Sequence, residues 1–317
     1  MAHVQLQTQH GAFTDTKQWH GDARASLARF LDAPGEVHTS RREKEIRYGS
    51  RRQSGSCASL RTQGLRGPPL FTPQSLLREA RRQKGLPPGT VPDVCVLDPD
   101  GDLVDHLRSS DRLSPHDTWA CYHTRLDTFA HEDMSYGIIG RVVGAPFAVL
   151  VAEELFASGC RLLISITSAG QILPLSPPPY VILIDKALRD EGTSYHYVPP
   201  APYSHLHPAL REVICAHWDH GRLPPHVGAS WTTDAPFRET EAMISRCRAK
   251  GILAVEMEAA ALYALAQARQ HQIICFAHVT NQMGQSEGDF EKGEASGSET
   301  ALQVIRQTSY CWSQRLD

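Results

Sequence analysis

Two carboxylates and a methionine, Glu256, Met257 and Glu258, stand where an apolar run gives way to an alanine-rich segment. The aliphatic run 252–255 predicts a buried strand, and the strong helix formers of 258–268 predict a helix. A carboxylate at the end of a strand and on the first turn of a helix points into the crevice where open α/β sheets bind ligands. Because ionised carboxylates only accept hydrogen bonds, this pair suits the hydroxyl groups of a sugar. The alternative is that both are ordinary first-turn acids, which the helix dipole favours.

The elements that must position these residues alternate between helix and strand beyond residue 71. We expect strands at 91–97, 138–143, 162–167, 181–185, 227–232, 252–255 and 273–280, with a turn at 168–170. We expect helices at 73–83, 147–158, 208–219, 239–250, 258–268 and 294–312, the first with Thr72 as its N-cap. This order predicts an α/β fold, a single three-layer α/β/α domain with a central, mainly parallel sheet.

Composition narrows the class of protein. The chain has 317 residues, 21% of them charged, and a net charge of −3, so no nucleic acid or other polyanion is expected as a partner. No apolar run approaches the roughly 20 residues that cross a bilayer, and no secretory signal is expected. Eight scattered cysteines without a C-x-x-C pair favour reduced thiols and a cytoplasmic location. Residues 1–68 are rich in Gln, His, Arg and Ser, and we expect a disordered extension preceding a domain at 69–317.

The string V-E-M-E-A-A-A at 255–261 resembles the ribose-binding signature of the purine nucleoside and uridine phosphorylase superfamily, which also includes the methylthioadenosine-type nucleosidases. The resemblance extends over roughly 91–312. It implies that Met257 packs under a ribose and that Glu258 binds the ribose hydroxyls, with Glu256 beside them. It further implies cleavage of a nucleoside's N-glycosidic bond and assembly into a homo-oligomer.

The phosphate-binding motifs of that family are only partly present. Where phosphorylases carry R-x-G-T-x-G, this chain has Ser165 at the arginine position and Thr167 at the first glycine position. Ser168 and Gly170 keep the pattern, with serine for threonine, and the Ser-Ala-Gly triplet resembles the hydrolytic nucleosidases. Phosphate recognition usually relies on bidentate arginine, so this departure puts phosphate binding in doubt.

The turn 98–101, Asp-Pro-Asp-Gly, departs from the family in the same direction. Phosphorylases have a G-D-P-x-R loop here, but Gly101 occupies the arginine position and the loop is acidic. An acidic loop repels phosphate. If phosphate does bind, Arg141, Arg189 or Arg238 must replace the missing arginines, and the sequence does not choose among them.

Two further strand ends could contact the sugar. The segment 140–146 leads into a helix and resembles the family's G-x-G-x-P-S turn, with Phe147 in place of the serine, so Gly144 is a candidate contact. A tight strand-to-helix turn explains the same residues. The segment 190–197 resembles a string in which a histidine lies near the ribose. That likeness places His196 near the 5′ end of a nucleoside, whereas taken by itself it suits a surface role.

The base is expected between two other segments. The segment 231–240 resembles the family's S-x-D-x-F string, displaced by one position, so Phe237 would stack on the base and Arg238 would hydrogen-bond to it. Asn281 stands where many relatives carry a proton-donating aspartate. An amide donates and accepts hydrogen bonds without giving up a proton, so Asn281 would stabilise the departing base. A capping role in a loop is the alternative for Asn281.

No metal and no cofactor are expected, although phosphate is a possible co-substrate. The histidines near 217–226 have no carboxylate or cysteine at ligand spacing. The expected activity is phosphorolysis of a purine or uridine-type nucleoside, with Glu258 and Asn281 as the catalytic residues. A phosphate-independent nucleosidase and a non-catalytic nucleoside-binding module are the two alternatives.

Overall fold

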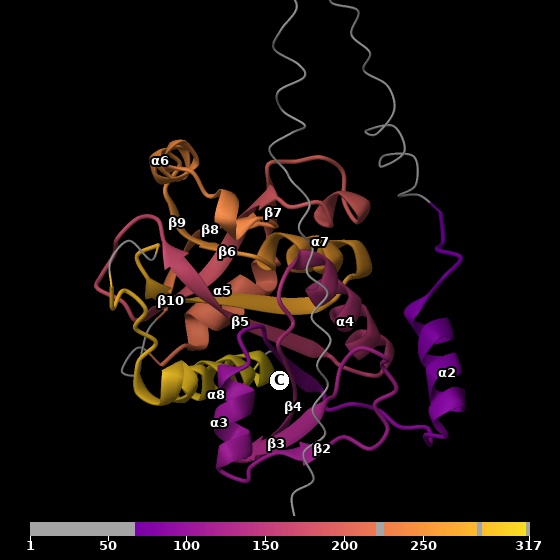
Figure 1. Ribbon diagram of the computed structural model, residues 1–317. Helices are drawn as coiled ribbons and strands as arrows, with labels where there is room; N and C mark the ends of the chain where they lie inside the picture. Colours follow the sequence, from indigo (N-terminus) through magenta and orange to yellow (C-terminus); the bar gives the residue numbers. More distant parts are fainter. Residues whose placement is uncertain (1–66, 220–224, 284–286, 315–317) are drawn as a thin grey trace, which may run out of the picture. The chain divides into compact units, whose positions relative to one another are not determined.

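A computed structural model describes residues 67–219, 225–283 and 287–314 (Figure 1). The expected N-terminal extension lies outside the described residues, except for its last two. The first described helix is α2 (Pro73–Lys84), and Thr72 caps it as predicted, because its hydroxyl accepts the Ser75 N–H at 3.1 Å.

The predicted strands and α-helices are all present in the described residues, with one more α-helix and three more strands between them. The strands are β1 (Val94–Asp98), β2 (Ser114–Pro115), β3 (Asp127–His131), β4 (Met134–Gly140), β5 (Leu162–Gln171), β6 (Tyr180–Asp190), β7 (Tyr203–His205), β8 (His226–Thr233), β9 (Ile252–Glu256) and β10 (Gln272–Asn281). The other α-helices are α3 (Asp102–Ser109), α4 (Ala145–Ala157), α5 (Pro208–His217), α6 (Glu241–Ala249), α7 (Ala259–Arg269) and α8 (Ser298–Ser313). The sequence analysis did not predict α3, β2, β3 and β7.

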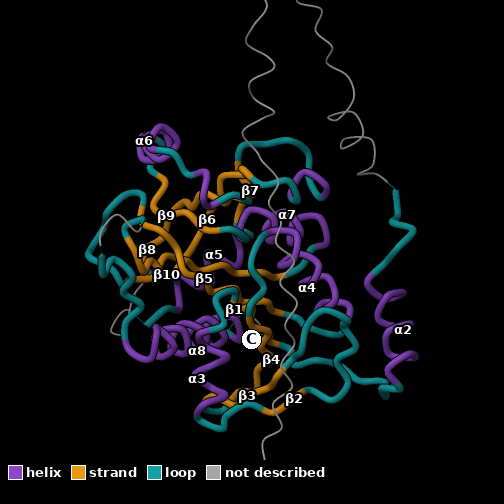
Figure 2. The backbone as a smooth tube through the Cα atoms, in the orientation of Figure 1, coloured by secondary structure: helices purple, strands orange, loops and turns teal. Residues whose placement is uncertain are grey.

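The described strands form one sheet in the order β10-β6-β8-β9-β5-β1-β4-β3-β2, with β7 beside β6 (Figure 2). Strand β10 also pairs with β5, so five strands close into a ring: β5, β9, β8, β6 and β10. The long ladders β10–β5 and β6–β8 are parallel, but half of the ten pairings are antiparallel. The sheet is therefore mixed. Short connections without a crossover helix, such as the hairpin between β3 and β4, return the chain antiparallel.

Helices pack on the sheet in two groups. In Figure 1, α4 and α7 lie together on one side of β5 and β10, and α3 and α8 lie on the other. Every residue of α7 from Ala259 to Ala266 is buried. Five of those eight residues are alanines, and their small side chains let the helix fit closely between the strands and α4. The residues at the end of β9 and the start of α7 are therefore buried inside the domain.

Strand β5 continues through the triplet 168–170, where the sequence analysis expected a turn. This part of β5 pairs on both sides, since Gly170 lies opposite Asn281 of β10 and Val255 of β9. A side chain at Gly170 would collide with its surroundings, because a Cβ there would lie 2.6 Å from the Met283 sulfur. The two long-range ladders outweigh the local turn preference of the Ser-Ala-Gly triplet.

Candidate active site

Glu258 is the central carboxyl group of the candidate site. Its side chain is 1% exposed, and one oxygen accepts the Gly144 N–H at 2.7 Å. Burial raises the pKa of Glu258 to about 8, and the negative charge of Glu256 adds to this effect. Hydrogen bonds from Gly144 and Thr167 act in the opposite direction. Glu258 can therefore hold a proton near neutral pH and can then donate a hydrogen bond as well as accept one.

Gly144 serves this carboxyl group through its backbone. Its φ of 92° lies in the region that favours glycine, and it stands directly before α4 as the N-cap residue. The free N–H at this helix start points at Glu258 instead of at solvent. Gly144 thus fixes the position of Glu258 through its backbone N–H, and its contact with a sugar stays a prediction.

The Glu256 carboxylate accepts four hydrogen bonds from the protein itself, and its role as a substrate contact stays a prediction. One oxygen accepts hydrogen bonds from the hydroxyls of Ser230 at 2.9 Å and Thr232 at 2.5 Å. The other oxygen accepts the N–H groups of Glu258 and Ala259, both at 2.7 Å. The four bonds satisfy a side chain that is 3% exposed, so Glu256 joins β8 and β9 to the start of α7.

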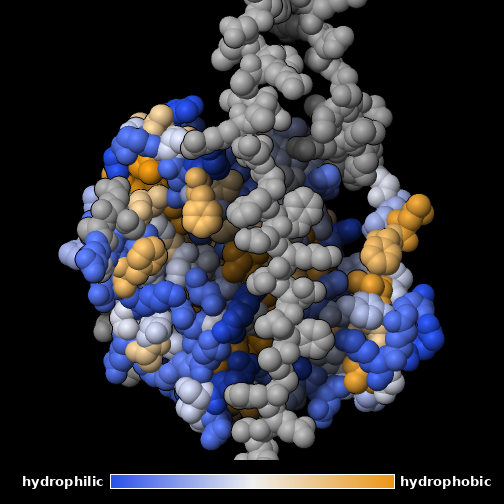
Figure 3. Space-filling view, viewed as in Figure 1, coloured by the Kyte–Doolittle hydropathy of each residue, from blue (hydrophilic) through white to orange (hydrophobic). Residues whose placement is uncertain are grey.

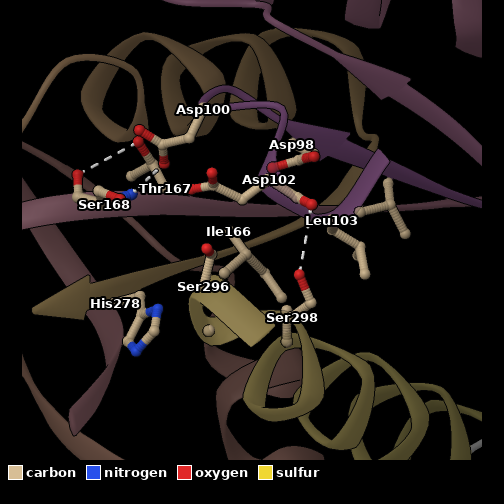
Figure 4. A pocket seen from close by; sticks show the side chains of 13 residues that line it. Asp98, Asp100, Asp102, Leu103, Ile166, Thr167, Ser168, His278, Ser296 and Ser298 are labelled. Carbon is tan, nitrogen blue, oxygen red and sulfur yellow. Dashed lines mark hydrogen bonds between the residues drawn. The ribbon is translucent and has the colours of Figure 1, made fainter. Parts of the chain in front are cut away.

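Three aspartates, Asp98, Asp100 and Asp102, line a small cavity (Figure 4) that is also lined by Thr167, a hydrogen-bond partner of Glu258. We call residues 98–102 the acid loop. Asp98 is buried, and its oxygens accept the N–H groups of Gly101 and Val104 at 3.2 and 2.9 Å. Burial raises the pKa of Asp98 to about 7, and the charges of Asp100 and Asp102 add to this effect. The cavity measures about 30 Å³, which is enough to hold a water molecule.

Asp100 contacts Ser168, the residue that the family resemblance aligns with a phosphate-binding threonine. Its carboxylate accepts the backbone N–H of Ser168 at 2.6 Å, and this bond is drawn in Figure 4. Asp102 forms an ion pair with Lys292, a residue that the sequence analysis did not single out. The acid loop is therefore bonded to β5 through Asp100 and to Lys292 through Asp102.

The three arginines considered as substitutes lie in different surroundings. Arg189 is buried and donates to Ser194 Oγ and to the Pro199 carbonyl oxygen, both at 2.8 Å, so it holds the loop after β6 together. Arg141 is exposed and pairs with Asp105 at 2.5 Å, and its side chain lies against Gly101 of the acid loop, where a Cβ would come within 2.9 Å of Arg141 Cγ. Arg238 is exposed on the short turn Pro236–Arg238.

Asn281 lies at the end of β10, next to Gly170 and buried. Its amide oxygen accepts the Met283 N–H at 3.0 Å, and its amide nitrogen donates to Thr280 Oγ1 at 3.3 Å. Within the part of the chain that the structure describes, the bond to Thr280 is the one hydrogen bond that the Asn281 amide nitrogen donates. Since the oxygen is already engaged, Asn281 in this arrangement is better suited to donate than to accept.

Three of the other predicted contacts are exposed to solvent. Phe237 is fully exposed, Arg238 and His196 are also exposed, and no described hydrogen bond or ring contact links them to Glu258 or Asn281. Met257 is half-buried, and its backbone N–H lies 3.3 Å from a Glu258 oxygen. The face shown in Figure 3 is largely hydrophilic, with separate apolar side chains among the polar ones.

Thr167, His278 and Lys292 also belong to this region, although the sequence analysis gave them no role. Thr167 hydrogen-bonds to Glu258, and His278 lines the cavity opposite Ser168 in the ladder between β5 and β10. The position of His278 near the end of a predicted strand was a signal that could have identified it. Within the described ranges, no group of three or more His, Cys, Asp or Glu residues is arranged to hold a metal ion.

A model of the family described as the phosphorylase superfamily matches residues 93–308. The chain belongs to this superfamily. The match includes β9, α7 and the acid loop, which surround the candidate site. Among the described helices, none is long and apolar enough to span a membrane.

Curated relatives in the superfamily match part of their length. Guanosine phosphorylase from Halorubrum lacusprofundi is 29% identical over 129 residues, covering 39% of this chain and 52% of that protein. A DeoD-type purine nucleoside phosphorylase from Exiguobacterium sibiricum is 30% identical over 146 residues, covering 44% and 60%. The uncharacterized protein R802 of Acanthamoeba polyphaga mimivirus is 27% identical over 146 residues, covering 46% and 56%. The chain thus spans little more than half the length of these relatives.

Solved structures share the fold at low sequence identity. Purine nucleoside phosphorylase from Toxoplasma gondii aligns with a TM-score of 0.59 at 16% identity, covering 72% of this chain and 93% of that one. Uridine phosphorylase from Vibrio fischeri aligns at 0.56 and 20%, with the same coverage. The 5′-methylthioadenosine/S-adenosyl homocysteine nucleosidase from Campylobacter jejuni aligns at 0.56 and 15%, covering 68% and 98%. The superfamily fold therefore occurs in both phosphorylases and a nucleosidase.

Proposed function

We propose that this protein cleaves the N-glycosidic bond of a nucleoside and that water is the nucleophile. One observation carries the choice of water, namely the Asp100 carboxylate bound to the Ser168 N–H at 2.6 Å. A phosphate dianion bound to the Ser168 N–H would have to displace the Asp100 carboxylate or lie beside it, and like charges at short range repel. Water is neutral, and carboxylates are suitable acceptors for its protons.

The acid loop would act on both the sugar and the water. As the C1′–N bond breaks, its electron pair leaves with the base and the ribosyl group becomes cation-like. The negative charge of Asp100 stabilises that cation. The water oxygen bonds to C1′, and one water proton passes to Asp100 and then to solvent.

The remaining residues would hold the two halves of the nucleoside. Glu258 binds the ribose hydroxyls, with Met257 packing under the sugar. The free amide hydrogen of Asn281 donates to the departing base, which leaves as an anion and takes its proton from solvent. Because Asn281 cannot supply that proton, the site favours a base that carries negative charge well, such as a purine with an oxygen substituent or uracil.

Phosphorolysis, giving free base and ribose 1-phosphate, is the second candidate. Two relatives that are 29% and 30% identical are named guanosine phosphorylase and purine nucleoside phosphorylase, which favours this reaction. It would require Asp100 to leave the Ser168 N–H and a cation such as Arg141 to approach phosphate.

A nucleoside panel incubated with and without phosphate, with the products separated by chromatography, tests the proposal. Free ribose at equal rates in both conditions is the expected result. Ribose 1-phosphate formed only with phosphate would establish the second candidate. Nucleoside binding without release of any base would instead identify a non-catalytic binding module. The variant Glu258→Ala is the control, since true turnover should fall steeply when the ribose contact is lost.

The subunit arrangement and location are also proposals. We infer a homo-oligomer in the cytoplasm, on the family resemblance and the reduced cysteines, and a three-layer arrangement on the two groups of helices. Light scattering after gel filtration measures the first of these directly.

A further inference from the structure

His278, near the end of β10, has a buried ring nitrogen without a hydrogen-bond partner. The residue is 7% exposed, and its Nε2 atom makes no hydrogen bond within the part of the chain that the structure describes. Most buried polar atoms in proteins are bonded, either to another group of the protein or to an ordered water molecule. The Nε2 atom of His278 is therefore a candidate binding position for a water molecule.

The cavity of the acid loop brings His278 close to Asp100. His278 lines this cavity together with the three aspartates (Figure 4). In the parallel ladder between β5 and β10, His278 lies opposite Ser168, and the Ser168 N–H is the group that Asp100 binds. The charge of Asp100 acts on the pKa of His278 and also on that of Glu258. Asp100 therefore lies within electrostatic range of both the imidazole and the carboxyl group proposed to bind the sugar.

Close packing against the start of α8 holds the His278 ring in place. A Cβ at Gly297 would overlap Cε1 of the ring and would lie 2.8 Å from its Nδ1 atom. Gly297 has a φ of 82°, which also favours glycine at this position. The next residue, Ser298, donates to the Asp102 carbonyl oxygen at 3.3 Å, so the start of α8 is joined to the acid loop. The ring is therefore confined between β10 and α8, beside the acid loop.

The surroundings of His278 favour its neutral form, which can accept a hydrogen bond. Burial lowers the pKa of His278, the charges of Asp100 and Asp102 act in the opposite direction, and the ammonium of Lys292 lowers the pKa further. The net effect is a lowered pKa. A neutral imidazole carries one N–H proton, so Nε2 is an acceptor when that proton is on Nδ1.

Asp100 offers a second acceptor to a water molecule in the cavity. Its Oδ2 atom accepts the Ser168 N–H at 2.6 Å, and no described hydrogen bond occupies Oδ1. Both oxygens of Asp98, in contrast, already accept backbone N–H groups. The cavity of about 30 Å³ has room for one water molecule. Such a water can donate one proton to Asp100 and the other to His278, which leaves its lone pairs free to attack.

We propose that His278 and Asp100 hold the attacking water between them, with His278 Nε2 accepting one of its protons in a hydrogen bond. This inference rests on the proposed function. The water oxygen bonds to C1′ as the C1′–N bond breaks, and the proton that faces Asp100 passes to that carboxylate. The second proton stays on the oxygen and becomes part of the new hydroxyl group of ribose. His278 remains neutral throughout and orients the water.

Competition between water and methanol as nucleophiles tests this role. In dilute methanol, wild type should release ribose almost free of methyl riboside, because a cavity for one water does not fit the extra carbon of methanol. His278→Ala enlarges the cavity and removes the acceptor, so methyl riboside should form in proportion to methanol. In this variant kcat should fall about ten-fold or more, while KM stays within about two-fold.

Two further variants control for effects on the fold. His278→Gln keeps an amide that can reach the position of Nε2, so it should keep the preference for water. His217→Ala, a matched change of an exposed histidine at the end of α5, should behave as wild type. Methyl riboside formed by wild type in the same proportion as by His278→Ala would overturn the role of His278.

A second measurement separates failure of this inference from failure of the proposed function. A crystal structure that resolves ordered water shows the partner of His278 Nε2 whether or not the protein turns over a nucleoside. A water within hydrogen-bond distance of both Nε2 and Asp100 is the expected result, and absence of ribose release would then refute only the hydrolysis. A Nε2 atom bonded to a protein group, or a water that fails to reach Asp100, would overturn the inference even if ribose is released.

Discussion

Replacing Glu258 by Gln should make the folded protein less sensitive to alkaline pH. The pKa of Glu258 is about 8 in the folded state against an ordinary 4.5, because the charged form is buried. Between these two values the unfolded chain binds fewer protons than the folded one, so stability falls as pH rises. At 1.36 kcal/mol per pH unit the upper limit of this loss is about 5 kcal/mol. Coupling to Glu256, which is also buried, divides the effect, and we expect about 2 kcal/mol from Glu258.

Urea unfolding of wild type and Glu258→Gln at half-unit steps from pH 5 to pH 9 measures this difference. The two free energies of unfolding should converge near pH 5, and the variant should gain on wild type as pH rises. Glutamine keeps an oxygen for the Gly144 N–H, so the local structure is preserved. Glu241→Gln, an exposed change on α6, is the control. Parallel curves for wild type and Glu258→Gln across the whole range would refute a buried, proton-binding carboxyl group.

Three further substitutions test the site. Gly144→Ala places a side chain at φ 92° and should lower the free energy of unfolding in urea by about 1–2 kcal/mol. It should also lower kcat because Glu258 is displaced, and an unchanged kcat would contradict the link between the two residues. Glu256→Gln replaces an acceptor of four hydrogen bonds and should lower the free energy of unfolding by about 2–3 kcal/mol, measured as a lower thermal midpoint. An unchanged midpoint would show that the hydrogen bonds of Glu256 to β8 and α7 are not needed for stability. Asp100→Asn should lower ribose release about 100-fold or more while nucleoside binding, measured by calorimetry, persists; wild-type release would remove Asp100 from the mechanism.

The sequence predicted the elements with strong local signals and missed interactions between distant segments. Strand β9 and helix α7 follow from an aliphatic run and an alanine-rich run, so Glu258 could be placed at their junction. The turn predicted at 168–170 was wrong because pairing with the distant strands β9 and β10 keeps those residues extended.

Site residues were missed for the same reason. The Asp100 bond to Ser168 spans 68 positions, and the Lys292 pair with Asp102 spans 190, so neither has a local pattern. Two of the four hydrogen-bond donors to Glu256, Ser230 and Thr232, lie more than 20 positions away, so the local pattern did not reveal them. Short-range patterns can place a carboxylate at a strand end, but its hydrogen-bond partners depend on the tertiary fold.

The closed ring of β5, β9, β8, β6 and β10 has a mechanical consequence. In an open sheet one strand can slide against its neighbour by itself, whereas in a ring a slip at one pairing must be matched at every other. The strand ends that carry Gly170, Asn281 and Glu256 therefore keep their spacing as a rigid rim. Side chains on this rim can be substituted without a change in the register of the strands. The same sheet can therefore support different reactions when the residues around it differ.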